Sequence, residues 1–165
     1  MAVAYFRSPI GLLQLTADQR KLRGLRLIDK EDKPAAPNGI TESVCAQLEA
    51  YFAGTLQAFS FAMLPHGTAF QVRVWAALSR VPYGKVVTYG QLASAIGQPT
   101  ACRAVANALG ANPILLALPC HRVVAATGLG GFSSGMPAKR QLLRHEGILS
   151  ADSDHILKKF FFTFP

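Results

Sequence analysis

The chain has 165 residues, half of them hydrophobic, and a formal net charge of +8. This length fits one domain or two small domains that share an interface. No apolar run approaches the roughly 20 residues that span a bilayer, and the first residues lack the apolar core of a secretory signal. The three cysteines have no metal-type spacing, so we expect reduced thiols in a cytoplasmic protein and no zinc site.

The first part of the chain predicts a small α/β structure. Two short apolar segments, Tyr5–Arg7 and Leu12–Thr16, flank a Ser-Pro-Ile-Gly turn and predict a hairpin, which Leu22–Ile28 extends as a third strand. A charged loop follows, and Thr41 is placed to cap a helix. The apolar face of that helix comprises Val44, Leu48, Tyr51 and Phe52.

The second part of the chain predicts mainly helices. Phe70, Val74 and Leu78 repeat every four residues and predict a first helix. A short extended piece at Val86–Val87 precedes a helix that runs to Ile96 and stops at a glycine and a proline. Another helix is expected at Ala101–Leu109, capped by Thr100 and ended by Gly110. Two short helices joined by a few residues predict a helix-turn-helix.

The second helix of this pair is composed almost entirely of small residues. Arg103 is its only long polar side chain, whereas a helix that reads bases in the major groove displays several. Small residues with one arginine suit a close approach to the minor groove and a single inserted side chain. The alternative is a helix packed tightly in a core, with Arg103 at its rim.

A thiol and an imidazole stand side by side at Cys120 and His121, after the apolar run Ile114–Leu118. A thiol is a good nucleophile only as the thiolate, and a histidine oriented by a carboxylate can take its proton. Glu146 is the first acidic residue after a gap of 96 residues, so it is the plausible carboxylate. A cysteine buried as an ordinary core residue is the alternative interpretation.

Charge is distributed unevenly along the chain. Residues 1–49 carry seven Lys/Arg and six Asp/Glu, close to balance. Residues 50–145 carry eight Lys/Arg and no acidic residue. One sign of charge on half of a molecule predicts a polyanion partner, here nucleic acid.

The C-terminal part begins with a glycine-rich loop at Gly128–Gly135, which lacks the ending of a phosphate-binding loop. A last helix is expected at about Pro137–His145. The tail, with two lysines followed by Phe160, Phe161 and Phe162, either docks on the body or is disordered.

Taken together, these motifs resemble the alkylguanine–DNA alkyltransferases, the methylated-DNA–protein-cysteine methyltransferases. The strong match covers Gly67–Gly147 and includes GTAFQVRVWAAL, VPYGKVVTYGQLASAIG, RAV, NP, PCHRVV and K-x-x-L-L-x-x-E-G, in this order. The first 64 residues match only loosely.

The resemblance implies an α+β fold with three parts. Residues 1–64 would form an RNase-H-like α/β domain, and residues 65–150 a mostly helical domain with a winged-helix-like helix-turn-helix that binds the minor groove. Residues 151–165 would form a tail. The implied activity is DNA repair, by irreversible transfer of an alkyl group from 6-O-alkylguanine, and from 4-O-alkylthymine, to the protein itself, once per molecule.

The resemblance also assigns roles to individual residues. Cys120 would accept the alkyl group, with His121 linked to it through a water and Glu146 behind His121. Asn112 would lie in the hinge near the site, and Tyr89 would donate a hydrogen bond to the guanine. Val123 and Ser133 would surround the flipped base. Arg103 would fill the gap in the duplex, and backbone at Gly90 and Gln98 would contact phosphates.

The implied partner is double-stranded DNA that contains alkylated guanine, bound by a monomer with no metal or organic cofactor and no membrane. The protein would be cytoplasmic and associated with the nucleoid or nucleus through DNA. Two other functions remain open from the residues alone. A Cys–His hydrolase explains Cys120, His121 and Glu146 but not the acid-free half, and a non-catalytic lesion-binding module would not need the thiol.

Overall fold

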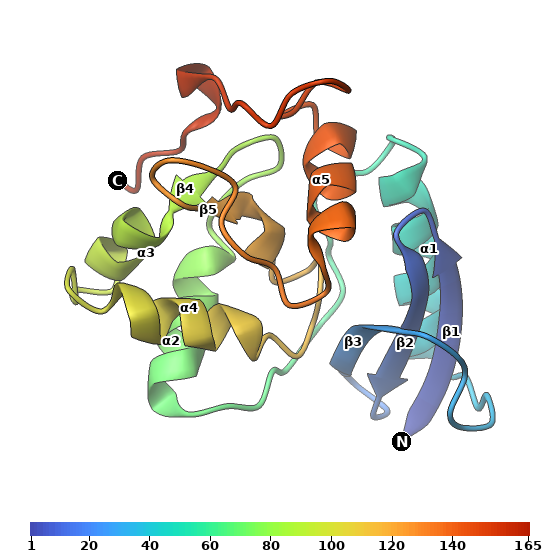
Figure 1. Ribbon diagram of the computed structural model, residues 1–165. Coiled ribbons are helices and arrows are strands. Elements are labelled where there is room, and N and C mark those ends of the chain that lie inside the picture. The colour runs from blue at the N-terminus through green and yellow to red at the C-terminus, as the bar shows by residue number, and fades with distance from the viewer. The chain divides into compact units, whose positions relative to one another are not determined.

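The computed structural model describes residues 1–165 and divides into two compact units. The first unit comprises Met1–His66 together with Pro113–Ala117, and the second comprises Gly67–Asn112 and Leu118–Pro165. The first is a small sheet with one helix, and the second is mainly helical (Figure 1). The α+β class expected from the sequence is confirmed.

The first unit contains an antiparallel sheet in the order β1-β2-β3, formed by Ala2–Ser8, Gly11–Ala17 and Leu22–Ile28. Each strand is close to the one predicted. Leu13 and Leu15 of the central strand are completely buried, as the alternation of a half-buried strand requires. The helix α1, Gly39–Phe52, packs on this sheet and contributes Val44 and Leu48 to the core.

The start of α1 differs from the prediction. The side chain of Asn38 caps the helix by accepting from the Thr41 backbone N–H at 3.0 Å, and the Thr41 hydroxyl accepts from the Asn38 N–H at 2.9 Å. Thr41 is therefore the third residue of a capping box and not the cap itself. The helix begins earlier than a threonine cap would allow.

The segment Pro113–Ala117 joins the edge of the first unit's sheet. The Leu25 N–H donates to the Pro113 carbonyl at 2.9 Å, and the Leu115 N–H donates to the Leu25 carbonyl at 2.8 Å. Ile114 is completely buried there. The apolar run before Cys120 is thus explained by the core of the first unit.

In the second unit, α2 spans Ala69–Leu78 and is held by a capping box between Thr68 and Gln71. Its buried face carries Val74 and Trp75, and the indole N–H of Trp75 donates to the Ala108 carbonyl at 2.9 Å. A buried indole needs such a partner. This bond fixes α2 against the helix that contains Ala108.

The helix pair lies at α3, Tyr89–Ala95, and α4, Cys102–Gly110, and the two helices pack on each other. The predicted α4 was Ala101–Leu109 with Thr100 as its cap, and this detail is wrong. The Ala101 N–H donates to the Gln98 carbonyl at 3.0 Å and closes a turn first. Ala101 is therefore the cap residue, and no side chain caps the helix.

A short parallel pairing joins β4, Val87–Thr88, to β5, Val123–Val124. The 3-10 turn η1, Cys120–Arg122, leads directly into β5, and α3 starts directly after β4. The pairing therefore sets the start of α3 beside the Cys-His turn. The helix α5, Met136–His145, completes this half of the unit and begins one residue before the prediction.

The tail docks on the second unit. The Val86 N–H donates to the Phe160 carbonyl and the Phe162 N–H donates to the Val86 carbonyl, both at 2.8 Å. A last turn, η2, spans Lys158–Phe160. Phe160 and Phe161 pack against a buried cluster of Val86, Val124, Leu129, Leu143, Ile148 and Leu149. None of the helices has the length and apolar character needed to cross a bilayer.

Candidate active site

Cys120 is the first residue of η1, and only 5% of it is exposed. The side-chain amide of Asn112 donates to the Cys120 sulfur at 3.1 Å and to the Leu118 carbonyl at 2.7 Å. One amide therefore ties the sulfur to the chain that precedes it. This contact brings Cys120 together with Asn112, the residue that the resemblance places near the site.

Burial raises the pKa of the Cys120 thiol above its ordinary value, because the thiolate is poorly solvated there. The hydrogen bond from Asn112 and the positive charge of Lys139 act in the opposite direction. The thiol at rest is thus protonated at neutral pH. A nucleophilic reaction requires a nearby group that takes its proton.

His121 and Glu146 form a buried pair. Nε2 of His121 lies 2.6 Å from Oε2 of Glu146, and neither side chain is more than 1% exposed. Glu146 follows the last residue of α5, where the backbone ends the helix. The carboxylate predicted for the histidine is the one that it meets.

Glu146 also holds a second partner from η1, Arg122. The guanidinium donates through Nε to Oε1 at 2.8 Å and through Nη2 to Oε2 at 3.0 Å, and the Gly84 N–H donates to Oε1 at 3.1 Å. Burial acts to raise the pKa of the Glu146 carboxyl, but His121 and Arg122 hold it well below its usual range. Glu146 is therefore ionised.

An ionised carboxylate can only accept hydrogen bonds, so Nε2 of His121 carries the hydrogen. The other ring nitrogen, Nδ1, is buried and has no hydrogen-bond partner in the protein. Burial lowers the pKa of His121, against the attraction of Glu146 and together with the charges of Arg122 and Lys139. A neutral His121 with a free Nδ1 lone pair is a proton acceptor.

Lys139 is a completely buried cation of α5. Its ammonium donates to the Val123 carbonyl at 2.7 Å and to the Gly131 carbonyl at 2.9 Å. Burial lowers its pKa to about 8, while Cys120 acts to raise it. Lys139 therefore ties β5 to the glycine-rich loop and places a positive charge near the sulfur.

Cys120 opens onto a cavity of about 310 Å³. This is at the lower end of the roughly 300–1,000 Å³ of small-molecule sites. The residues that line it come from the start of α3, the exposed side of α4 and the glycine-rich loop: Tyr89, Ala106, Leu109, Gly110, Cys120, Gly131, Phe132 and Ser133. A flat group of limited size can thus reach the sulfur from the α4 side.

The glycine-rich loop closes over Tyr89. The Gly131 N–H donates to the Tyr89 hydroxyl at 3.3 Å, and Gly130 has a φ of 72°. A Cβ on Gly130 would lie 2.7 Å from that hydroxyl, so a larger residue would push the tyrosine away. The loop is therefore part of the site and not a plain connector.

The exposed residues of α4 are small except for Arg103 and Asn107. Arg103, Ala104, Ala106 and Gly110 are exposed, and Val105 and Ala108 are buried. The helix is thus neither completely buried in the core nor covered by several long polar side chains. Arg103 stands exposed on a face that also leads to the cavity.

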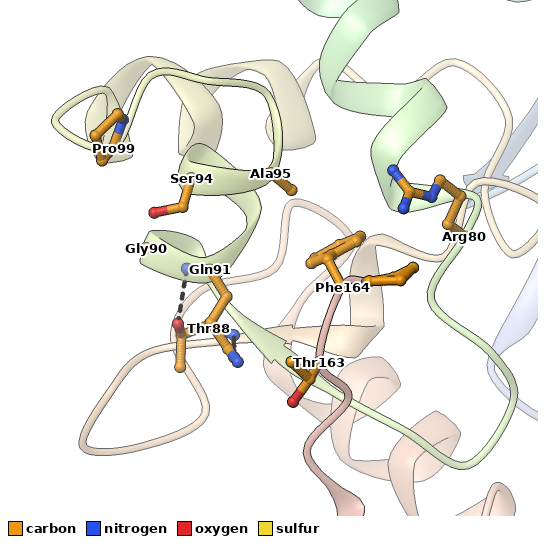
Figure 2. A pocket seen from close by; sticks show the side chains of 10 residues that line it. Arg80, Thr88, Gly90, Gln91, Ser94, Ala95, Pro99, Thr163 and Phe164 are labelled. Carbon is orange, nitrogen blue, oxygen red and sulfur yellow. Dashed lines mark hydrogen bonds between the residues drawn. The ribbon is translucent and has the colours of Figure 1, made fainter.

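Three other predicted residues lie outside the cavity. Val123 is completely buried in β5 and does not line it. Gly90 lies in the first turn of α3, and the Gln98 N–H already donates to the Ala93 carbonyl at 3.0 Å. Gly90 instead lines a second hollow, where Figure 2 shows Thr163 and Phe164 of the tail near the start of α3.

Two further residues of the site, Arg122 and Lys139, had no predicted role in it. They were two of the eight cations expected on a basic surface, but both turn inward and are buried. Their positions in the sequence were the available signal. Arg122 directly follows His121. Lys139 is seven residues before Glu146, so it lies on α5 and Glu146 lies at the end of that helix.

Chemically, the cluster can activate Cys120 as a nucleophile toward a group bound in the cavity. No set of three or more His, Cys, Asp or Glu side chains is gathered to hold a metal ion.

Two family models match the chain. The model for the 6-O-methylguanine DNA methyltransferase ribonuclease-like domain matches residues 1–65, and the model for the DNA binding domain of the same family matches residues 69–148.

Similar proteins agree with these matches. The methylated-DNA–protein-cysteine methyltransferase of Methanosarcina acetivorans is 43% identical over 154 residues, which cover 89% of this chain and 99% of that protein. A crystal structure of the Mycobacterium tuberculosis O6-methylguanine methyltransferase is 40% identical, with a TM-score of 0.81 over 92% of this chain and 96% of that one.

A structure of the Mycobacterium tuberculosis protein in complex with DNA is 41% identical, with a TM-score of 0.82 over 88% of this chain and 92% of that one. The chain belongs to the 6-O-methylguanine DNA methyltransferase family, and the resemblance stated from its motifs is confirmed.

Proposed function

We propose that this protein repairs DNA by moving the alkyl group of 6-O-alkylguanine to the sulfur of Cys120, once per molecule. The observation that carries this proposal is the cavity of about 310 Å³ at Cys120, which is lined by α4, Tyr89 and the glycine-rich loop and has room for one small flat group. Family membership supports the same activity, since named relatives are methylated-DNA–protein-cysteine methyltransferases.

The proposed substrate is double-stranded DNA. An alkylated base inside a stacked duplex is out of reach of a buried thiol, so the nucleotide must be flipped into the cavity. We propose that α3 and α4 act as a helix-turn-helix in the minor groove, where the small exposed residues of α4 permit close approach. Arg103 would then fill the gap that the flipped base leaves, and backbone at Gly90 and Gln98 would lie near phosphates.

Two residues are proposed to contact the flipped base. The Tyr89 hydroxyl can donate a hydrogen bond to the guanine, and Ser133 lines the same cavity. Val123 would support the site without touching the base, because it is buried outside the cavity and its carbonyl accepts from Lys139. Asn112 would keep the sulfur aimed at the cavity through its 3.1 Å hydrogen bond.

The reaction needs three changes of bonding. The Cys120 proton moves to Nδ1 of His121, directly or through a water. The sulfur then forms a bond to the alkyl carbon while the bond from that carbon to the guanine oxygen breaks, and the electron pair stays on the oxygen. Protonation of the base, with Tyr89 as a donor, gives guanine. The thioether has no easy leaving path, so the protein is consumed.

We further propose that the protein acts as a monomer in a reducing compartment, which would be the cytoplasm with its nucleoid or the nucleus. All three cysteines are free, which supports such a compartment. An alkylated thymine oxygen, as in 4-O-alkylthymine, presents the same kind of carbon to the sulfur and is a second proposed substrate.

The test is mass spectrometry after incubation with a duplex oligonucleotide that carries 6-O-methylguanine. We expect one added methyl group per protein, on the peptide that contains Cys120. Cys45 and Cys102 are free thiols in the same chain and serve as internal controls. An unchanged intact mass under reducing conditions, or methylation spread over all three cysteines, would show the proposal to be wrong.

The same experiment separates this function from a Cys–His hydrolase, which would use the same pair of residues. A hydrolase turns over many times and leaves no stable adduct. Alkyl transfer ends at one equivalent of product per protein, however long the incubation.

A further inference from the structure

We propose that Arg122 is a positioning residue for the alkyl transfer: its guanidinium holds the Glu146 carboxylate where Oε2 meets Nε2 of His121, and so leaves Nδ1 as the proton acceptor. This inference rests on the proposed function and assigns it one more residue. Arg122 does not line the cavity, so it acts through Glu146 and His121 and not on the substrate.

The geometry of Arg122 is that of a clamp. Nε and Nη2 contact the two oxygens of Glu146 at 2.8 and 3.0 Å, and Nη1 donates to the Val81 carbonyl at 2.8 Å. The guanidinium also lies 5.8 Å from the ring centre of Tyr83. With its donors divided between a carboxylate and a backbone carbonyl, Arg122 allows Glu146 only one orientation.

The clamp has a consequence for His121. Oε2 accepts from both Nη2 of Arg122 and Nε2 of His121, so the arginine neutralises the charge that would otherwise draw a second proton onto the imidazole. The charged groups that face His121 are Glu146, Arg122 and Lys139, and Cys120 is its titratable neighbour on η1. Glu146 is the only one of these that favours the imidazolium.

Loss of the guanidinium charge should therefore favour proton uptake by the Glu146–His121 pair. Nε2 keeps its hydrogen for Glu146, so a proton that the imidazole takes up binds at Nδ1. His121 can no longer take the proton from the Cys120 sulfur. The thiol stays protonated, and no bond to the alkyl carbon forms.

The experiment compares the full-length protein with Arg122→Met and Arg122→Lys. Arg140→Gln is the matched control, since Arg140 pairs with Asp154 near the surface, away from the cavity. Two readouts are followed against pH: the single-turnover rate with methylated duplex, and the ¹⁵N signals of His121. The other histidines, His66, His145 and His155, serve as internal references.

In the wild type we expect an unprotonated Nδ1 at neutral pH. In Arg122→Met we expect its protonation, and the acidic limb of the rate profile, to move up by about one pH unit or more, which is roughly a tenfold slower reaction at a fixed acidic pH. Arg122→Lys keeps the positive charge but cannot form both hydrogen bonds to Glu146. The pH at which the rate falls on the acidic side should therefore be unchanged, while the maximal rate is lower. Arg140→Gln should change neither.

A loss of rate at every pH with an unmoved limb and unmoved Nδ1 titration would overturn the proposal, because that is the behaviour of a purely structural arginine. If Arg122→Met does not fold, the wild type and Arg122→Lys still test the proposal. A protonated Nδ1 in the wild type at neutral pH would refute it. So would an Arg122→Lys variant whose rate falls at a different acidic pH from the wild type. The ¹⁵N titration needs no reaction, so it tests Arg122 even if the wild type transfers no alkyl group.

Discussion

Lys139 provides a test of how the buried charges contribute to stability. Its ammonium is completely buried, and burial lowers its pKa from 10.5 to about 8. In the unfolded chain the same group keeps an ordinary pKa. We therefore predict that the free energy of unfolding rises with pH between about 8 and 10.5 because of Lys139, and that Lys139→Met abolishes this rise.

The sign follows from proton counting. Between the two pKa values the unfolded chain still holds the lysine proton and the folded protein has lost it, so raising the pH favours the folded state. Below pH 8 both states are protonated, and the folded state carries the full cost of the buried charge. A shift of about 2.5 units, at about 1.4 kcal/mol per unit, corresponds to about 3 kcal/mol over this window.

The assay is urea unfolding at several pH values between 7.5 and 10.5, with both proteins in a Cys120→Ser background. The serine removes the neighbouring thiol, whose own ionisation would change stability in the same window. It also removes the interaction that raises the Lys139 pKa, so the rise extends to lower pH than in the wild type. Lys85→Met is the control, because the Lys85 ammonium donates to the Lys159 carbonyl in a more open environment. We expect the control to keep the rise.

The absolute stability of Lys139→Met at neutral pH is a weaker measure than this slope. Removing the ammonium relieves a buried charge but leaves the carbonyls of Val123 and Gly131 without their donor, and each unpaired group costs about 1–3 kcal/mol. The two effects oppose each other. Equal slopes with and without Lys139 would refute the reasoning, whatever the stability at pH 7.

Three further predictions concern function. Glu146→Gln should slow single-turnover transfer by about 10²-fold or more, the usual contribution of acid–base catalysis, and a change of only a few fold would deny Glu146 its role. Arg103→Ala should slow repair of duplex DNA more than reaction with a free 6-O-alkylguanine base, and equal losses would contradict insertion into the duplex. Duplex affinity, measured by fluorescence anisotropy, should fall linearly on a log–log plot against salt, and a flat response would exclude binding through phosphates.

The elements that could be predicted from the sequence are those set by local chemistry. The strand Leu22–Ile28 has the bounds expected from its apolar residues, and Gly97 and Pro99 marked the end of the first helix of the pair. Errors occurred at helix starts. Asn38 competes with Thr41 for the cap of α1, and a turn at Gln98 delays α4, and neither outcome follows from residue preferences alone.

The contact between His121 and Glu146 was predictable for an unusual reason, the absence of any other acid in 96 residues. The same gap hid the roles of Arg122 and Lys139. Eight cations without local acids suggested a basic surface, and residue type and charge alone do not distinguish Arg122, which is buried, from Arg103, which is exposed. The difference arises from tertiary packing that brings the end of α5 against η1.

The buried charges together explain how a protonated thiol can become a nucleophile. Arg122 and Glu146 neutralise each other through two hydrogen bonds, which leaves Lys139 as a cation without a charged partner beside Cys120. A cluster with one excess positive charge favours a thiolate over a thiol, whereas desolvation favours the thiol. The balance is tipped only when His121 accepts the proton, so the reactivity of the sulfur depends on the orientation of the imidazole. A free surface thiol such as Cys102 has none of these groups around it, and it should not compete for the alkyl group of a flipped base.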